Sequence, residues 1–213
     1  PDSSKLAYGA DLNTDQVIEL LSVLPDGSGE LTLNGALVSG GSLIRTASAA
    51  NFPDVQWSPD STHIAYLADQ DTNDVVEVFV SSADGTTNTK VSGAMIANGG
   101  ATHLGRGHYS WSYDSSKVLY LATQFVQNKI DILASNRDGS SNNRVSREPL
   151  GNLVWFGQWS ADNSRIVYLS RQNDSLVVEL YIANPEGTIN RSISGSIVTG
   201  GGVVCCQLTT WSH

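Results

Sequence analysis

The sequence of 213 residues is poor in charge, in cysteine and in long apolar segments, and each scarcity excludes a class of function. Charged residues make up only 15% of the chain, and 12 Lys and Arg face 21 Asp and Glu, for a net charge of −9. Binding to nucleic acid or to an anionic membrane surface needs clustered positive charge, so we expect neither. No segment approaches the ~20 apolar residues of a membrane span, so we expect no membrane insertion.

Two further absences concern chemistry. The only cysteines are the adjacent Cys205 and Cys206, which give no disulfide framework and no metal-ligand spacing. The sequence contains no Gly-x-Ser-x-Gly motif of a serine hydrolase and no Gly-x-x-x-x-Gly-Lys motif of a phosphate-binding loop. No complete catalytic constellation is recognisable, and the sequence therefore favours a protein that is not an enzyme.

What the sequence does have is an internal repeat. A Trp-Ser-x-Asp motif is followed by a Tyr six residues after its Asp, by an acid eleven residues later, and by an acid–Gly pair after seven more. The N-terminal copy begins at the Asp of this frame, and four copies keep the spacing without insertion or deletion. The aromatic positions of the repeat are Trp57, Trp111, Trp159, Trp211, Tyr8, Tyr66, Tyr120 and Tyr168.

Each copy is predicted to form four β-strands. Short apolar segments such as residues 64–66 and 75–80 predict the second and third strands, and Asp84-Gly85 predicts the turn that follows, since Gly accepts positive φ. Residues 17–21 have helix-like spacing, but their aligned partners are rich in β-branched and aromatic residues. We therefore expect a strand there as well.

Copies of about 50 residues with four strands each are typical of β-propeller blades, which bury their faces by stacking around an axis. The motif that runs from Trp57 to Gly85 resembles the WD-like repeats of the TolB and tricorn-protease type of β-propeller. The resemblance covers essentially the whole chain and implies an all-β, single-domain propeller over residues 1–213. The expected blades are residues 1–50 plus 204–212, 51–104, 105–153 and 154–203.

The two ends of the chain fit each other in the repeat frame. The first copy lacks its first strand, and the C-terminal segment that ends at Trp211-Ser212 supplies a strand of that kind. A ring closed in this way has no exposed sheet edges. Two closures are compatible with the sequence: a four-bladed monomer, or a homodimer that exchanges strands and completes an eight-bladed ring.

Ligands of propellers usually bind loops on one face. The loops between the second and third strands, such as residues 11–15 and 69–74, are expected to share a face with the Gly-rich connections between blades, such as residues 39–41. That face is acidic and suits a cation, a sugar or a basic peptide. Asp69, Asp71 and Asp74 belong to it. The spacing of Asp69, Asp71 and Asn73 resembles the start of a calcium loop, although an ordinary polar turn has the same composition.

Three other features are candidates for binding. His103, Arg106 and His108 form the only histidine cluster, and histidines near a channel can hold a metal or transfer protons. Trp155 lies outside the repeat frame and is either a binding platform or a plug in a short connection. We identify no definite catalytic residue, metal ligand or cofactor; calcium remains an option.

The resemblance and these candidates give two functional hypotheses. The first is a non-catalytic binding scaffold, periplasmic or extracellular, that recognises a protein or glycan at the acidic loop face. The alternative is the propeller subunit of a peptidase, or a metal-assisted lyase acting on polysaccharide with His103 and His108.

Overall fold

The computed structural model describes residues 2–43, 55–104, 111–147, 154–171, 176–198 and 201–203. This part of the chain is all β and forms four antiparallel sheets, one of three strands and three of four strands. We number the sheets along the chain. Sheet 1 contains β1 (Leu6–Ala10), β2 (Glu19–Val23) and β3 (Leu31–Thr32); sheet 2 contains β4 (Val55–Trp57), β5 (His63–Ala68), β6 (Glu77–Ser82) and β7 (Asn88–Lys90). Sheet 3 contains β8 (Gly100–Leu104), β9 (Lys117–Thr123), β10 (Asp131–Asn136) and β11 (Asn142–Arg144); sheet 4 contains β12 (Val154–Trp159), β13 (Ile166–Ser170), β14 (Glu179–Ala183) and β15 (Asn190–Ser192).

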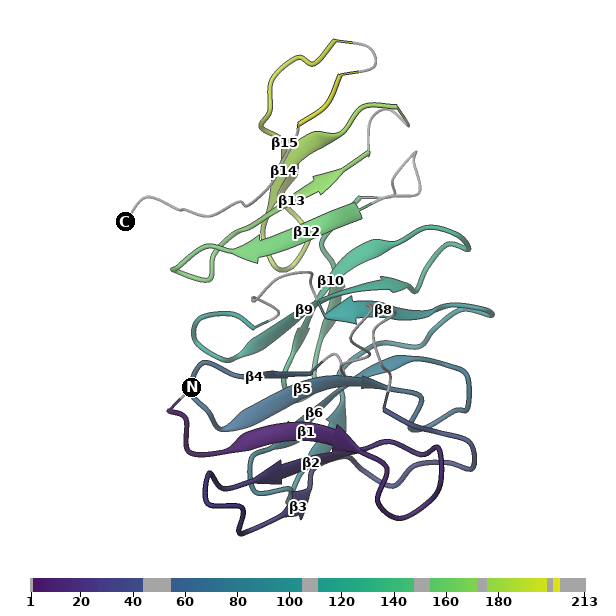
Figure 1. The fold of residues 1–213 in the computed structure, drawn as a ribbon. Helices are drawn as coiled ribbons and strands as arrows, with labels where there is room; N and C mark the ends of the chain where they lie inside the picture. The colour runs from purple at the N-terminus through teal and green to yellow at the C-terminus, as the bar shows by residue number, and fades with distance from the viewer. Residues whose placement is uncertain are drawn as a thin grey trace.

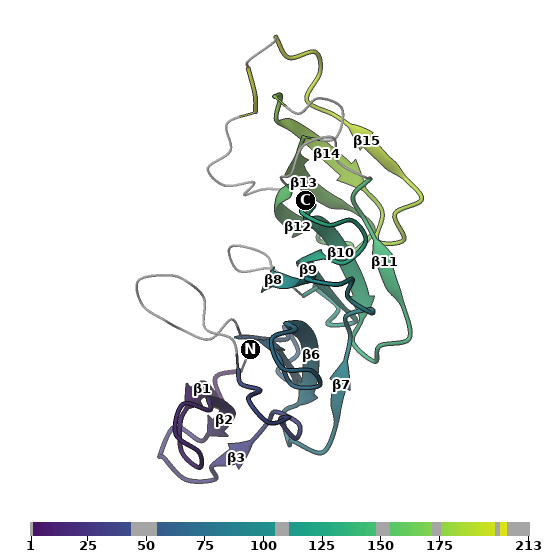
Figure 2. The ribbon, with the colours of Figure 1, turned by 90° about the vertical axis from the view of Figure 1, so that its right-hand side faces the viewer.

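The sheets stack face to face in chain order (Figure 1), and the stack is curved when it is seen from the side (Figure 2). Strand neighbours in space are also neighbours in sequence in every sheet, which is the meander topology of propeller blades. The predicted all-β architecture of four repeated units is confirmed, and a strand does form where residues 17–21 predicted one, although β2 spans Glu19–Val23. Among the described residues, no helix has the length and apolar character needed to cross a bilayer.

One predicted boundary needs correction. The strand β8 pairs with β9, so residues 100–104 belong to sheet 3, whereas the repeat frame assigned them to the second blade. The reason is that the first strand of this sheet starts directly after the Gly99 turn, in a segment whose glycines resemble loop. The C-terminal strand that we expect to complete sheet 1, with its Trp211, lies outside the described residues. Ring closure therefore stays a prediction.

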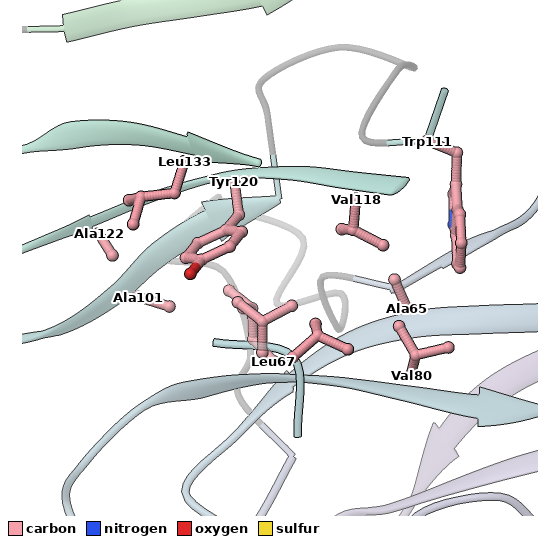
Figure 3. Packing of buried hydrophobic residues seen from close by; sticks show 11 residues of the cluster. Ala65, Leu67, Val80, Ala101, Trp111, Val118, Tyr120, Ala122 and Leu133 are labelled. Carbon is pink, nitrogen blue, oxygen red and sulfur yellow. The ribbon is translucent and has the colours of Figure 1, made fainter. Parts of the chain in front are cut away.

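The core lies between the sheets, because successive residues of a strand point to opposite faces. In β5, Tyr66 packs toward Leu20 and Leu33 of sheet 1, whereas Ala65 and Leu67 pack toward sheet 3. Figure 3 shows the second of these contacts. Val118 and Tyr120 of sheet 3, together with Trp111, which forms a bridge to Val118, face Ala65, Leu67 and Val80 of sheet 2. The same arrangement recurs between sheets 3 and 4 around Trp159 and Tyr168, so each middle sheet is buried on both faces.

A polar contact joins consecutive sheets within these apolar layers. The Asn that lies 22 residues after the repeat Tyr donates its side-chain amide both to that Tyr and to a backbone carbonyl of the preceding sheet. In sheet 2, Asn88 Nδ2 donates to Tyr66 Oη at 2.7 Å and to the Leu33 carbonyl at 3.1 Å. We call this contact the amide clasp; Asn142 and Asn190 make it onto the carbonyls of Val91 and Val145 in the sheets before them.

Sheet 1 departs from this pattern. Tyr8, its repeat tyrosine, is only half-buried, and the residue 22 positions later is Glu30, which accepts a hydrogen bond from Tyr8 Oη at 2.5 Å. A carboxylate cannot donate to a carbonyl, so sheet 1 does not carry the donor of the amide clasp.

Candidate functional site: a cavity on the loop face of sheet 1

A cavity of about 520 Å³ lies on the loop face of sheet 1. Its lining comprises Thr14, Val17, Glu19, Thr32 and residues 34–41. These residues come from the loop between β1 and β2, from the first residue of β2, from the last residue of β3, and from the connection that leads to sheet 2. The sequence predicted that such loops and connections share a face, and the hydrogen bond from the Leu43 amide to the Ile18 carbonyl, at 2.9 Å, confirms it.

Local hydrogen bonds shape both walls of this cavity. In the loop wall, the Gln16 amide donates to Asp11 Oδ2 at 2.6 Å, and the Val17 amide donates to the Thr14 carbonyl at 2.9 Å. In the connection wall, Gly40 has φ of +86°, a conformation that favours glycine, and the Gly41 amide closes the turn on a carbonyl three residues earlier. The walls are therefore compact turns with ordered backbone.

The corresponding place in sheet 2 holds a lysine. Lys90 stands 13 residues after Glu77, and its Nζ lies 3.0 Å from Glu77 Oε1 and 3.1 Å from Asp71 Oδ2. The Glu77 side chain is only 6% exposed, so Lys90 neutralises a nearly buried carboxylate. Burial alone would lower the pKa of Lys90, but its hydrogen bonds to Glu77 and Asp71 outweigh that effect and raise it.

The third sheet also places a cation at this position. Arg144 Nη2 lies 2.8 Å from Asp131 Oδ1, and the guanidinium stands 5.1 Å from the ring centroid of Phe125. In sheet 4 the position is Ser192, whose hydroxyl donates to Glu179 Oε1 at 3.0 Å, while Tyr181 donates to the other carboxylate oxygen. Each of these acids therefore has partners from its own sheet.

In sheet 1 the position is Thr32, which is too short to fill the space that Lys90 occupies in sheet 2. Glu19 is half-buried and accepts a hydrogen bond from Asn13 Nδ2 at 2.5 Å. Within the described residues, no ion pair to Glu19 is found. The cavity is thus a place where a carboxylate lines open space that another repeat fills with a cation.

The predicted calcium loop is organised in another way. Asp69 is buried, and its two carboxylate oxygens accept the backbone amides of Ser42 at 2.6 Å and Asp74 at 3.0 Å. Asp71 pairs with Lys90, and Asp74 is exposed with a left-handed backbone. Among the described residues, no three His, Cys, Asp or Glu side chains are grouped closely enough to hold a metal ion.

The remaining predicted residues are described only in part. His103 lies in β8, and Trp155 lies in β12 next to a register shift, but their side chains are not among the described groups. Arg106 and His108 fall outside the described residues. All three described repeat tyrosines of sheets 2 to 4 are buried, as are Trp111 and Trp159, whereas Trp57 is half-buried.

The sequence reasoning missed the site around Glu19, Thr32 and Asn34. Glu19 is the repeated acid of the first copy. The signal that would have found the site is the residue 13 positions after that acid, which is Thr32, Lys90, Arg144 or Ser192 in the four copies and separates sheets 1 and 4 from sheets 2 and 3.

The four stacked antiparallel sheets define the molecule as a propeller-type repeat protein, and solved structures share this fold. TolB from Acinetobacter baumannii matches with a TM-score of 0.51 and 13% identity over 93% of this chain and 43% of its own. An oligogalacturonate lyase in complex with manganese matches with a TM-score of 0.53 and 15% identity over 86% of this chain and 46% of its own. Dipeptidyl peptidase 4 from Porphyromonas gingivalis matches with a TM-score of 0.62 and 9% identity over 88% of this chain and 32% of its own.

These likenesses confirm the TolB-like propeller resemblance at the level of the fold. No protein-family model and no curated protein matches the sequence. The chain spans less than half the length of each of these three structures.

Proposed function

We propose that this protein is a non-catalytic binding propeller that recognises a protein or glycan at its acidic loop face. The observation that carries the proposal is the cavity of about 520 Å³, which lies where the loops of that face meet. Its volume falls within the roughly 300–1,000 Å³ of sites that take small ligands. Concave sites built from loops on a rigid β-scaffold are common binding sites.

Charge on the loop face supports the same proposal. Asp11, Asp15, Asp71 and Asp74 are exposed on the loops of sheets 1 and 2. Carboxylates can accept hydrogen bonds from sugar hydroxyls and attract basic groups of a partner protein. The surface therefore suits both ligand classes named above and disfavours acidic partners.

The test blocks the cavity and leaves the rest of the face intact. Ala36→Trp places a large side chain at an exposed lining position, and Ala94→Trp makes the same change at the equivalent position of sheet 2. We expect the parent protein and Ala94→Trp to bind the same members of peptide and glycan arrays, and Ala36→Trp to lose them. Unchanged binding by Ala36→Trp would contradict the proposal.

The enzymatic alternative is kept because one similar structure is an oligogalacturonate lyase in complex with manganese, and because His103 lies on a strand, β8. Here the chain would act as a metal-assisted lyase through His103 and His108, or as the propeller of a peptidase. Metal analysis of purified protein separates these ideas. A transition metal that is lost in His103→Ala would favour the lyase.

Closure, assembly and location complete the proposal. We propose that the C-terminal segment with Trp211 closes the ring, either within a monomer or in a homodimer with eight blades, in the periplasm or outside the cell. Light scattering distinguishes the two assemblies, since the chain mass is 22.7 kDa and a dimer has twice that. Cell fractionation tests the location, which is supported by the fold shared with TolB.

A further inference from the structure

We infer that the cavity of sheet 1 takes the primary ammonium group of a lysine side chain from a partner protein. The inference rests on the proposed function and specifies the chemistry of its ligand. It comes from comparing equivalent positions of the repeat, where one copy of the fold shows which group fits beside the acid.

The first step is the position of Lys90 in sheet 2. Its ammonium group lies against Glu77, the equivalent of Glu19, and against Asp71, the equivalent of Asn13. The backbone around the two acids is also equivalent, because the Ala101 amide donates to the Val76 carbonyl as the Leu43 amide does in sheet 1. A lysine ammonium therefore fits beside this acid in this fold.

The second step is the set of acceptors that sheet 1 keeps. Glu19 retains the carboxylate, Asn13 retains a side-chain oxygen where sheet 2 has a second carboxylate, and Thr32 contributes a hydroxyl. One carboxylate balances one ammonium, so an incoming lysine leaves no excess charge. A guanidinium lacks a second carboxylate or a ring to stack on here, whereas Arg144 of sheet 3 uses Phe125.

The third step is the apolar part of the lining. Val17 and Leu37 are half-buried, and Ala36 is exposed, so methyl and methylene groups lie along the path to Glu19. A lysine buries its four-carbon stem along such surface while its charged end is solvated or paired. An amino sugar carries its ammonium on a polar ring and has no comparable stem.

The experiment uses NMR titration of the full ¹⁵N-labelled chain with a blocked Gly-Lys-Gly peptide, its Nε-acetyl-lysine form and glucosamine. We expect the lysine peptide to shift the amide signals of residues 35–41. Acetylation of the peptide and the substitution Glu19→Gln should each weaken binding by about tenfold, since each removes a charge-assisted hydrogen bond.

A filled-cavity variant and its control sharpen the result. Thr32→Lys should abolish peptide binding and raise the melting temperature, because it places the lysine of sheet 2 in sheet 1. Ser192→Lys adds the same charge at the equivalent position of sheet 4, outside the cavity, and should leave the titration unchanged.

The two proposals fail in different ways. Equal binding of the acetylated peptide, a response to glucosamine alone, or no response to the lysine peptide would overturn the lysine assignment. If array ligands are nevertheless lost in Ala36→Trp, the binding function stands and only its ligand chemistry is wrong. If no array ligand depends on Ala36, both proposals fail.

Discussion

Sheets 1 and 2 are built on the same repeat frame, but their equivalent side chains make different contacts. In sheet 2, Tyr66 is buried against sheet 1, Asn88 clasps a carbonyl of that sheet, and Lys90 neutralises an acid. In sheet 1 the equivalent residues are Tyr8, Glu30 and Thr32, which are half-buried or exposed. The comparison indicates that the repeat keeps the backbone geometry, whereas the two substituted positions, Glu30 for Asn88 and Thr32 for Lys90, change the contacts that the sheet makes.

The largest expected difference concerns the repeat tyrosines. Tyr66→Ala removes a ring that is buried between sheets and stacks on Phe79 at 5.6 Å, so we expect the free energy of unfolding to fall by about 3–5 kcal/mol. Tyr8→Ala removes a half-buried ring and should cost about 1 kcal/mol or less. Urea unfolding of both variants measures the difference, and equal losses would show that sheet 1 is covered as tightly as sheet 2.

The amide clasp gives the next largest effect. Asn88→Glu installs the residue of sheet 1 in sheet 2, where it cannot donate to the Leu33 carbonyl. Leaving this buried carbonyl without its donor should lower the free energy of unfolding by about 1–3 kcal/mol.

The reciprocal substitution is the control for the clasp. In Glu30→Asn the Tyr8 hydroxyl can still donate to a side-chain oxygen, so we expect a change within about 0.5 kcal/mol. A large stabilisation by Glu30→Asn would indicate that a carbonyl of another blade already lies against sheet 1, as in a closed ring.

Much of the fold was predictable because it is local and repeated. The spacing from Trp-Ser-x-Asp to the acid–Gly turn indicates where strands begin and end. Alignment to β-rich copies predicts the strand β2 even though its residues have helix-like spacing. The start of β8 was not predictable, since its glycine resembles loop and its pairing with β9 depends on residues far along the chain.

The candidate site also depends on contacts between residues that are far apart in the sequence, which the sequence alone does not show. Asp69 is an acid of the kind that binds cations, yet its carboxylate accepts the Ser42 amide of the connection that leads into sheet 2, a contact between residues 27 positions apart. The cavity depends on Thr32 and Glu19, which sit on adjacent strands. The sequence shows a threonine, Thr32, where the second copy has a lysine. Only the fold shows that the shorter side chain lines a cavity.

A smaller effect is expected from the ion pair that sheet 1 lacks. Lys90→Thr leaves Glu77 nearly buried without its cation, and we expect a loss of about 1–2 kcal/mol, because the 38% exposed lysine is partly screened by water. Since the pKa of Lys90 is raised, this contribution is present at neutral pH and disappears only as the pH rises through that pKa. Denaturation at pH 7 in low and high salt measures it, and no loss would mean that the cation is dispensable in this repeat.

The smallest effect concerns the turns on the opposite side, where the sheets are alike. Burial alone would raise the pKa of Asp60, but hydrogen bonds from Ser58 and Thr62 and the charge of Arg137 lower it to about 2. A carboxyl whose pKa is depressed in the folded state adds stability above its ordinary pKa and loses it as the pH falls toward about 2. Asp60→Asn should therefore make unfolding less sensitive to pH between about 4 and 2.

The pKa of Asp2 is also lowered, first by the Ser4 amide, so Asp2→Asn should change the same profile in the same direction. Opposite pH responses of the two variants would show that sheet 1 differs from sheet 2 in its turns as well as in its contacts.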